Sequence, residues 1–471
     1  MRARCARMKA HVNPPRIVWL RRDLRLADQP AFCAAAEQGA VIPVYVLDEA
    51  IAADRRMGGA SRWWLHGSLK ALSDDLTSRG SRLILRRGDV IEQLTIVAQE
   101  AGASGIDAIR HYEPWWREAE EQLAQRLDLS LHEGNYLVPP GLVTTGSGQP
   151  FKIYTPFARA LLRLLPLREP LDVPALTPPL AWPASDRLED WKLLPERPDW
   201  AAGFRKSWVP GERAAHAQLD DFLDKAADYA EARNEPAVDG SSRLSPHLHW
   251  GEISPTQVWH ALESVGGAGA ETYRGEIIWR DYAQNVLYQC PRYPERNYRD
   301  TFDRFAWRDP NTDEAAAADL DAWRQGLTGY PIVDAGMRQL WATGWMHNRV
   351  RMIAASFLVK HLLIDWRLGA RWFWDTLVDA DYANNGVNWQ WVSGSGVDSN
   401  MFPRIMAPLS QSVKFNAADY IREWVPELSA LPDAEIHDPP ESLRPASYPP
   451  KRLAHREARE RALAAYRAAR D

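Results

Sequence analysis

The feature that most constrains this fold is an alternation of two hydrophobic periods in the first third of the chain. Short runs rich in β-branched residues are expected as strands at 17–20, 41–47, 82–85, 106–109 and 129–132. Between them, apolar residues recur at helical spacing over 30–38, 61–78, 90–101 and 115–127. Strands and helices that alternate in this way form a parallel sheet with helices on both faces. Residues 15–145 are therefore predicted to form one doubly wound α/β domain.

The remainder of the chain follows a different pattern. Prolines recur every few residues between Pro166 and Pro210 and interrupt any long helix, which predicts an interdomain linker over 146–210. Helical spacing then dominates, over 212–232, 254–264, 271–288, 315–325, 332–343, 348–363, 371–378 and 452–470. We therefore expect an all-α domain over 211–471 behind the parallel-sheet domain and its long linker.

Length and composition limit the class of protein. With 471 residues, of which 45% are hydrophobic and 25% charged, the chain can form more than one core and can bury a large cofactor. Its three cysteines, Cys5, Cys33 and Cys290, are far apart and lack metal-ligand spacing, which indicates a reduced, cytoplasmic compartment and no metal site. No segment approaches the ~18 apolar residues of a membrane span, and residues 1–15 are expected to be a loose extension.

Charge and known nucleotide motifs exclude further classes. The net charge of −5 argues against general coating of nucleic acid but leaves room for a local basic face. The α/β region has neither GxGxxG after a strand nor GxxxxGK[ST], so it is not a recognisable dinucleotide or P-loop module. Any ligand of that region is expected outside the carboxyl ends of the strands.

One stretch, 379–391, concentrates side chains that suit a planar cofactor. It reads Asp-Ala-Asp-Tyr-Ala-Asn-Asn-Gly-Val-Asn-Trp-Gln-Trp, in a chain with 22 tryptophans against 11 phenylalanines. Carboxylates and amides can hydrogen-bond to the edge of a heteroaromatic ring, and indoles can stack on it or carry electrons to it. A tryptophan-rich core edge with Asn and Asp as caps explains the same residues. From these residues alone the two interpretations are balanced.

Other segments of the helical region add candidate chemistry. The hydroxyls of 240–246 could hold a phosphate, although an ordinary helix cap explains them equally simply. Glu276 and Trp279 are three residues apart and share a helix face, as Asn348 and Met352 do at a spacing of four. The segment 402–415 carries polar and basic side chains that could contact a nucleic-acid backbone.

Several motifs in constant order resemble the photolyase/cryptochrome flavoprotein family. They are Trp-Leu-Arg-Arg-Asp-Leu-Arg-Leu at 19–26, Gly-Ser-Ser-Arg-Leu-Ser-Pro at 240–246, Thr-Gly-Tyr-Pro-Ile-Val-Asp-Ala-Gly-Met-Arg-Gln-Leu at 328–340, Gly-Trp-Met-His-Asn-Arg-Val-Arg-Met at 344–352, and the stretch 379–391. The resemblance spans about 17–428 and is strongest to bacterial cyclobutane pyrimidine dimer photolyases. It implies a C-terminal helical domain that binds FAD without a covalent bond.

The resemblance assigns the FAD contacts residue by residue. It places the phosphates and ribityl chain on Tyr229, Ser241, Ser242, Leu244 and Ser245, and the ribose and flavin ring on Asp379, which pairs with Arg351, and on Asp381. Asn385 falls where the family places the residue that faces flavin N5. Plant cryptochromes carry Asp there and many animal cryptochromes carry Cys. Because an amide does not add a negative charge that opposes flavin reduction, Asn385 favours a repair enzyme.

The resemblance also implies the substrate contacts and the electron path. The residues expected around a flipped dimer are Glu276, Trp279, Asn348, Met352 and Trp391. Those expected on the DNA backbone are Arg233, Arg349, Arg404, Gln411 and Lys414, and those expected to relay electrons are Trp389, Trp366 and Trp307. The implied reaction is light-driven electron donation from reduced FAD that splits the dimer. The alternatives are a cryptochrome-type blue-light receptor and a (6-4) photolyase.

An antenna chromophore is expected in addition to FAD. Methenyltetrahydrofolate is the first expectation and a deazaflavin the second, although Trp115-Trp116 replaces the Asn-Glu pair of folate-binding relatives. Gln411-Ser412-Val413-Lys414 also departs from the Gly-Glu that relatives commonly carry before the lysine. The expected partner is damaged DNA that contains cyclobutane pyrimidine dimers, bound by a monomer with no attachment to a membrane.

Overall fold

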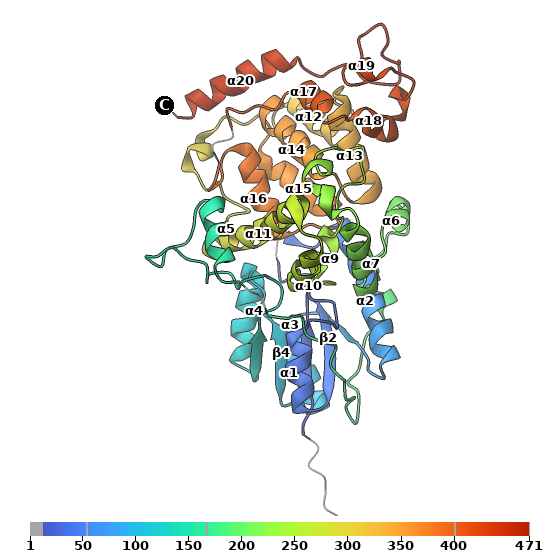
Figure 1. Cartoon of the computed structure of the whole chain (residues 1–471), viewed down its shortest axis with the longest axis vertical. Coiled ribbons are helices and arrows are strands. Elements are labelled where there is room, and N and C mark those ends of the chain that lie inside the picture. The colour runs from blue at the N-terminus through green and yellow to red at the C-terminus, as the bar shows by residue number, and fades with distance from the viewer. Residues whose placement is uncertain (1–12, 53–54, 166–167, 400–401, 471) are drawn as a thin grey trace, which may run out of the picture.

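A computed structural model describes residues 13–52, 55–165, 168–399 and 402–470 of the chain. The expected loose extension at 1–15 falls mostly on residues 1–12, which lie outside the described residues. In Figure 1 the sheet and its helices form one end of the molecule, and the helices from α11 (Gly267–Gln289) onward form the other.

The N-terminal part is the predicted parallel sheet. Its strands are β1 (Arg16–Leu20), β2 (Val41–Leu47), β3 (Ile84–Arg87), β4 (Gly105–Ile109) and β5 (Leu129–His132), in the order β3-β2-β1-β4-β5, and every pairing is parallel. Its helices are α1 (Pro30–Gln38), α2 (Gly59–Ser78), α3 (Val90–Ala101) and α4 (Pro114–Ala124). The expected doubly wound α/β architecture is confirmed.

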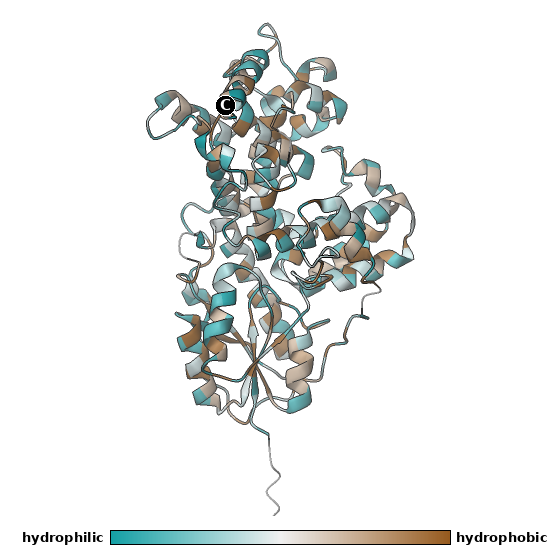
Figure 2. Ribbon diagram, turned by 90° about the vertical axis from the view of Figure 1, so that its left-hand side faces the viewer, coloured by the Kyte–Doolittle hydropathy of each residue, from teal (hydrophilic) through white to brown (hydrophobic). Residues whose placement is uncertain are grey.

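Alternating residues of the central strands supply two separate cores. Val18 and Leu20 pack with α1 and α2 on one face, and Ile17 and Trp19 pack with α3 and α4 on the other. Strands that are buried on both faces must be apolar throughout, which is why β1 and β2 are almost continuous hydrophobic runs. Figure 2 shows this as brown strands at the centre of helices with teal outer faces.

Several predicted element bounds were wrong in detail, and two of them show the cause. The third strand begins at Ile84 rather than at residue 82, because its pairing with β2 starts at Val44 opposite Ile84. The fourth helix ends at Ala124 rather than at 127, because the chain turns there to enter β5. Both errors lie at element ends, where local hydrogen bonding rather than hydrophobic period decides the boundary.

The expected linker contains short helices and packs on its neighbours. It includes α5 (Tyr154–Leu162), the 3₁₀ turn Leu188–Trp191 and α6 (Ala202–Ser207). Trp191 and Leu193 are buried in the core that contains α2, whereas Leu194 is exposed. The domain limits 15–145, 146–210 and 211–471 themselves stay a prediction.

The C-terminal part is helical, as predicted. After α7 (Glu212–Leu223) and α8 (Tyr229–Ala232) come α9 (Ser245–Trp250), α10 (Pro255–Ala261), α11, α12 (Glu314–Gln325), α13 (Pro331–Thr343), α14 (Asn348–Ser356), α15 (Trp366–Thr376), α16 (Tyr382–Ser393), α17 (Pro408–Lys414), α18 (Ala418–Trp424), α19 (Asp433–Ile436) and α20 (His455–Ala468). Within the described ranges, no helix is long and apolar enough to cross a membrane.

Several helices differ from the prediction; α15, for example, begins at Trp366 rather than at residue 371. The segment 212–232 is split into α7 and α8 by the 3₁₀ turn Ala226–Asp228, and 348–363 becomes α14 followed by a π-helical turn at Phe357–His361. Helix α16 was not predicted, because Asn384, Asn385 and Gly386 are poor helix formers. The side chain of Asp381 accepts the backbone N–H of Asn384 and begins this helix, and burial of its apolar residues maintains it.

Candidate functional site

A cavity of about 420 Å³ opens between α11, α14, α15 and α16. It collects most of the residues that the sequence singled out from distant segments. The predicted residues that line it are Arg233, Glu276, Trp279, Asn348, Arg349, Arg351, Met352, Asp379, Asp381, Asn385, Trp389 and Trp391. The candidate cofactor and substrate residues therefore share one space.

Helix α16 is held close to α15 at one side of this cavity. A Cβ built on Gly369 would lie 2.2 Å from Cη2 of Trp389, so only glycine permits this approach. Asn385 donates from Nδ2 to the carbonyl of Ala370 at 3.0 Å. These two contacts fix the rotation of α16, which presents Asn384 and Asn385 to the cavity.

Asp379 is a fixed carboxylate at the cavity wall. Arg351 donates to its two oxygens at 3.1 and 2.9 Å, and the hydroxyl of Ser245 donates to Oδ2 at 2.6 Å. Arg351 is itself oriented by a 2.7 Å bond from Nε to the carbonyl of Met346. The predicted pair of Arg351 with Asp379 is therefore present and joins α14, α9 and the loop before α16.

Asp381 is the second carboxylate and lies half-buried beside a histidine. His249 Nδ1 lies 3.6 Å from its Oδ2, and the side chain of Asn384 donates to its Oδ1 at 2.8 Å. Burial opposes ionisation, yet the contact with His249 and the backbone N–H of Asn384 hold the pKa of Asp381 well below its usual range. The cavity thus has an ionised acceptor beside the amide nitrogens of α16.

The opposite wall combines an ion pair with an aromatic stack. Glu276 pairs with Arg233, whose guanidinium lies over the ring of Tyr229. Trp279 stacks on Tyr154, with ring centroids 3.5 Å apart and planes 5° apart. An aromatic surface beside a paired carboxylate can stack a base and hydrogen-bond to its edge.

The residues expected at the FAD phosphates and ribityl chain lie beside the cavity rather than in its lining. Ser242 and Leu244 are buried, and the hydroxyl of Ser242 accepts from Tyr273 at 2.9 Å. Tyr229 packs edge-on against the same Tyr273. Ser241 lines a separate cavity of about 270 Å³. Of this loop, Ser245 makes the direct bond to the main site.

The three tryptophans proposed as a relay lie on α15 or in segments that contact α15 and the residues just before it. Trp389 packs against Gly369, three residues after the fully buried Trp366 on α15. The backbone N–H of Arg308 donates to the carbonyl of Leu363 at 2.8 Å. This bond places the segment of Trp307 beside the residues that precede α15. Trp389 thus packs against α15 itself, whereas the segment of Trp307 bonds to the chain just before α15.

The remaining DNA candidates lie after α16. Gln411 and Lys414 are on α17, and the ammonium group of Lys414 lies near the ring of Phe415. The guanidinium of Arg349 lies 4.6 Å from the centre of the same ring. Arg404 is exposed, and its backbone carbonyl accepts from Lys360 at 3.1 Å. These three candidates do not line the cavity itself.

The sequence did not reveal some of the residues that form the site. Asn384 and Asn388 line the cavity one helical turn apart, a spacing that would have been informative had α16 been expected. Tyr154 comes from the linker, and its stacking on Trp279 joins residues 125 positions apart. No local pattern signals such a contact.

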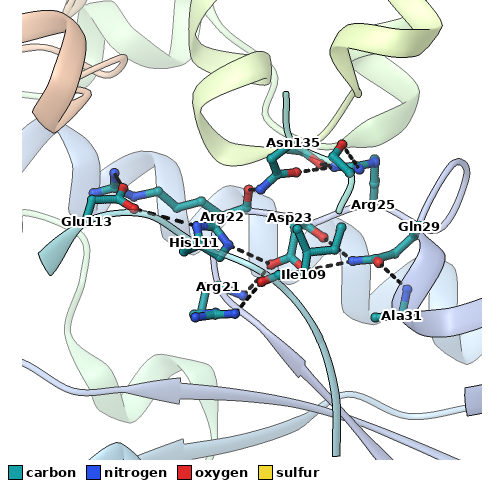
Figure 3. A network of polar contacts seen from close by, with 12 residues as sticks. Arg21, Arg22, Asp23, Arg25, Gln29, Ala31, Ile109, His111, Glu113 and Asn135 are labelled. Atoms are coloured by element: carbon teal, nitrogen blue, oxygen red, sulfur yellow. Dashed lines mark hydrogen bonds and ion pairs between the residues drawn. The ribbon is translucent and has the colours of Figure 1, made fainter. Parts of the chain in front are cut away.

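A buried polar network connects this site to the sheet domain. Figure 3 shows the motif after β1, where the backbone N–H of Arg21 donates to Asp23 and Arg25 donates to the side chain of Asn135. Arg25 also donates to the carbonyl of Gly251 at 3.0 Å, directly after α9. The motif at 19–26 therefore supports the helix that carries Ser245 and His249.

Comparisons with known proteins agree with one another over most of the chain. Residues 16–177 match the family model described as DNA photolyase, and residues 273–468 match the FAD binding domain of DNA photolyase. A deoxyribodipyrimidine photo-lyase of Agrobacterium fabrum is 47% identical over 96% of this chain and 98% of its own length. Cryptochrome-2 of Arabidopsis thaliana is 34% identical over 90% of this chain and 72% of its own length.

A solved structure has the same fold. The crystal structure of a bacterial class III photolyase from Agrobacterium tumefaciens superposes with a TM-score of 0.93 at 45% sequence identity, and the match covers 99% of both chains.

Proposed function

This chain belongs to the DNA photolyase family, and we propose that the cavity between α11, α14 and α16 is where it carries out light-driven repair of cyclobutane pyrimidine dimers. One observation carries this proposal: Glu276, Asn348 and Met352 line the same cavity as Asp381 and Asn385. The side chains suited to a pair of linked pyrimidines and those suited to a flavin therefore line one cavity.

The residues present fit FAD. The fixed carboxylate of Asp379, the ionised Asp381 and the amides of Asn384 and Asn385 supply acceptors and donors for a sugar and a heteroaromatic edge. When bound, FAD supplies the photoexcited electron that splits the dimer and is afterwards recovered. No acid or base of the chain has to be consumed in such a cycle, so the protein contributes position and electrostatics.

The chain's own residues hold the lesion. A dimer must leave the helical stack to enter the cavity, and a lesion that stacks poorly is easier to extrude. Trp279 and Trp391 offer aromatic surface to the extruded bases, and Asn348 and Glu276 offer hydrogen-bonding groups to their edges. Met352 adds a flexible apolar side chain to the same cavity wall.

Repair rather than light sensing is favoured by Asn385. An amide at this position hydrogen-bonds without placing a second negative charge beside a reduced cofactor, whereas a carboxylate would oppose reduction. Relatives of both kinds are similar to this chain, and the repair enzyme named above has the higher identity of the two.

An antenna site is proposed in the sheet domain. A second cavity of about 450 Å³ lies at the carboxyl ends of β2 and β3, where parallel sheets bind ligands. Trp115 and the first turn of α3 line it, and Arg87 adds a cation at its edge. Methenyltetrahydrofolate is the first candidate for this site and a deazaflavin the second.

The DNA is proposed to approach the cavity mouth along Arg233, Arg349, Arg404, Gln411 and Lys414. Basic and amide side chains at such positions bind phosphates and set the register of the duplex. We expect the protein to act as a monomer, and its three scattered cysteines fit a reduced, cytoplasmic compartment.

Repair assays test this function directly. Oligonucleotides that contain either a cyclobutane dimer or a (6-4) lesion should be incubated separately with photoreduced protein under blue light. We expect restoration of the dimer only. Restoration of the (6-4) lesion alone would overturn the substrate assignment, and failure with both lesions despite fully reduced FAD would support a light receptor. The absorption spectrum of the purified protein identifies FAD and any second chromophore in the same preparation.

A further inference from the structure

A buried lysine lies beneath the segment that carries Arg404. Helix α14 ends in the π-helical turn Phe357–His361, where the N–H of Leu362 bonds to the carbonyl of Phe357 at 3.1 Å. Single π turns inside α-helical segments are rare and are frequent at functional sites. Here the turn directs Lys360 into the protein, where its side chain is 1% exposed.

The ammonium group of Lys360 contacts the backbone of the 402–404 segment. Its Nζ donates to the carbonyl of Arg404 at 3.1 Å and lies 5.8 Å from the ring centre of Phe402. Arg404 itself is exposed, whereas Phe402 is buried. The lysine therefore holds the inner side of a short segment whose outer side carries a basic side chain.

The same segment is held from two other directions. The ring of Tyr466 on α20 stacks on Phe402, with centroids 4.8 Å apart and planes 12° apart. A Cβ built on Gly394, which follows α16, would lie 2.8 Å from Cβ of Phe402. The segment is thus wedged between α20 and the end of the helix that carries Asn385 and Trp391.

Packing alone does not explain a lysine at this place. An ammonium group costs free energy when it leaves water, and a methionine of similar length would fill the same space without that cost. Burial lowers the pKa of Lys360 to about 7. The buried ammonium group of Lys360 nevertheless donates to the backbone of a segment whose side chain at 404 is exposed.

We propose that Lys360 is a positioning residue for DNA binding, which holds the 402–404 backbone so that the side chain of Arg404 meets the DNA phosphates. This inference rests on the proposed function, because it takes DNA as the ligand of Arg404. Lys360 does not touch DNA and acts through Arg404.

The charged and titratable groups near Lys360 do not titrate in the same pH range. His361 follows it in the π turn, and burial lowers the pKa of His361 to about 3. Two side chains of α20 contact His361. Nδ1 of His455 lies 2.8 Å from Nε2 of His361, and Arg461 donates to the carbonyl of His361. Burial lowers the pKa of His455 as well, so both imidazoles are neutral above pH 7. A change in DNA affinity between pH 6.5 and 8.5 that depends on residue 360 therefore reports the lysine.

The test compares Lys360→Met with the wild type in the flavin-loaded, full-length protein. Dissociation constants are measured in the dark for an oligonucleotide with one cyclobutane dimer, at pH 6.5, 7.5 and 8.5. At pH 6.5 we expect binding to be weakened about tenfold, the loss of roughly one charge-assisted hydrogen bond. The wild type should lose affinity toward pH 8.5 more steeply than Lys360→Met does. Lys70→Met, which removes an exposed lysine of α2, should match the wild type.

Two further measurements separate positioning from a structural role. The urea midpoint of Lys360→Met should equal or exceed that of the wild type at pH 6.5, because a buried charge has been removed. In an Arg404→Ala background, Lys360→Met should cause no additional loss of affinity.

The idea is overturned if Lys360→Met binds the damaged oligonucleotide as the wild type does, or if its effect persists in full without Arg404. A parallel fall in affinity, flavin content and urea midpoint would also overturn it and assign Lys360 to the fold. A wild type that does not bind damaged DNA would instead refute the proposed function, which the same binding series reveals independently.

Discussion

Asp281 provides a quantitative test of how burial changes the pKa of a carboxylate and the stability of the fold. This carboxylate of α11 is fully buried, and its Oδ2 accepts the backbone N–H groups of Leu137 and Val138 at 2.9 and 3.2 Å. Its Oδ1 has no hydrogen-bond partner among the described residues. Burial is the largest effect and raises the pKa from the ordinary 3.8 to about 7, although the charge of Arg280 and the two N–H groups oppose it.

The sign of the pH dependence follows from this rise. The folded state binds the proton of Asp281 more tightly than the unfolded state does, so the stabilisation is complete below pH 3.8 and is lost as the pH rises through about 7. At about 1.36 kcal/mol per pKa unit, the free energy at stake is about 4 kcal/mol above pH 8.

Substitution of Asp281 by Asn should remove this loss. The carboxamide oxygen can keep both backbone bonds, and the side chain no longer ionises. We expect Asp281→Asn and the wild type to have equal free energies of unfolding near pH 4 and to diverge with rising pH, until the variant is more stable by up to about 4 kcal/mol at pH 8.5.

Urea titrations followed by tryptophan fluorescence at pH 4.5, 6, 7.5 and 8.5 measure this difference, with flavin content matched because a bound ligand also stabilises the fold. Asp74→Asn on the surface of α2 is the control, and its effect should stay within about 0.5 kcal/mol at every pH. A variant that is less stable than the wild type by the same amount at every pH would refute the reasoning, since it would mean that the ionised carboxylate is needed.

Three further substitutions test the site. Asn385→Asp should make reduced flavin reoxidise several-fold faster, because it adds a negative charge at the cavity wall; an unchanged reoxidation trace in air would contradict the role of the amide. Trp389→Phe should slow photoreduction by at least tenfold while repair by chemically pre-reduced protein stays within about twofold, and equal losses in both assays would exclude the relay. Gly369→Ala should lower the free energy of unfolding by about 1–3 kcal/mol, because its Cβ would overlap the ring of Trp389; an unshifted urea midpoint would show that α15 and α16 can separate freely.

Secondary structure was easier to predict from the sequence in the sheet domain than in the helical domain. Strands β1 and β2 were predictable because burial on both faces requires uninterrupted apolar runs, a signal that a single sequence displays. Helix α16 was not, because Asn384 to Gly386 disfavour a helix locally and the surrounding packing overrides that preference. The family motif nevertheless singled out side chains of this helix that line the cavity, because a motif records side chains and not backbone conformation.

The candidate site shows the same division. Its polar members, such as Asp379 and Arg351, were named in advance, and the structure adds that they bond to each other and to Ser245. Contacts made by the linker could not be foreseen, because they depend on where a segment without helical period crosses the surface. The roles assigned to individual residues toward FAD and DNA stay predictions that the experiments above address.

The stack of Tyr154 on Trp279 leaves one face of the indole ring available to a ligand. An indole has two faces, and Tyr154, which is not part of the cavity lining, covers one of them from behind at 3.5 Å. An extruded base can then lie on the other face alone. Under the proposed function, the two linked pyrimidines would therefore share a single aromatic face at Trp279 rather than lie on both sides of it.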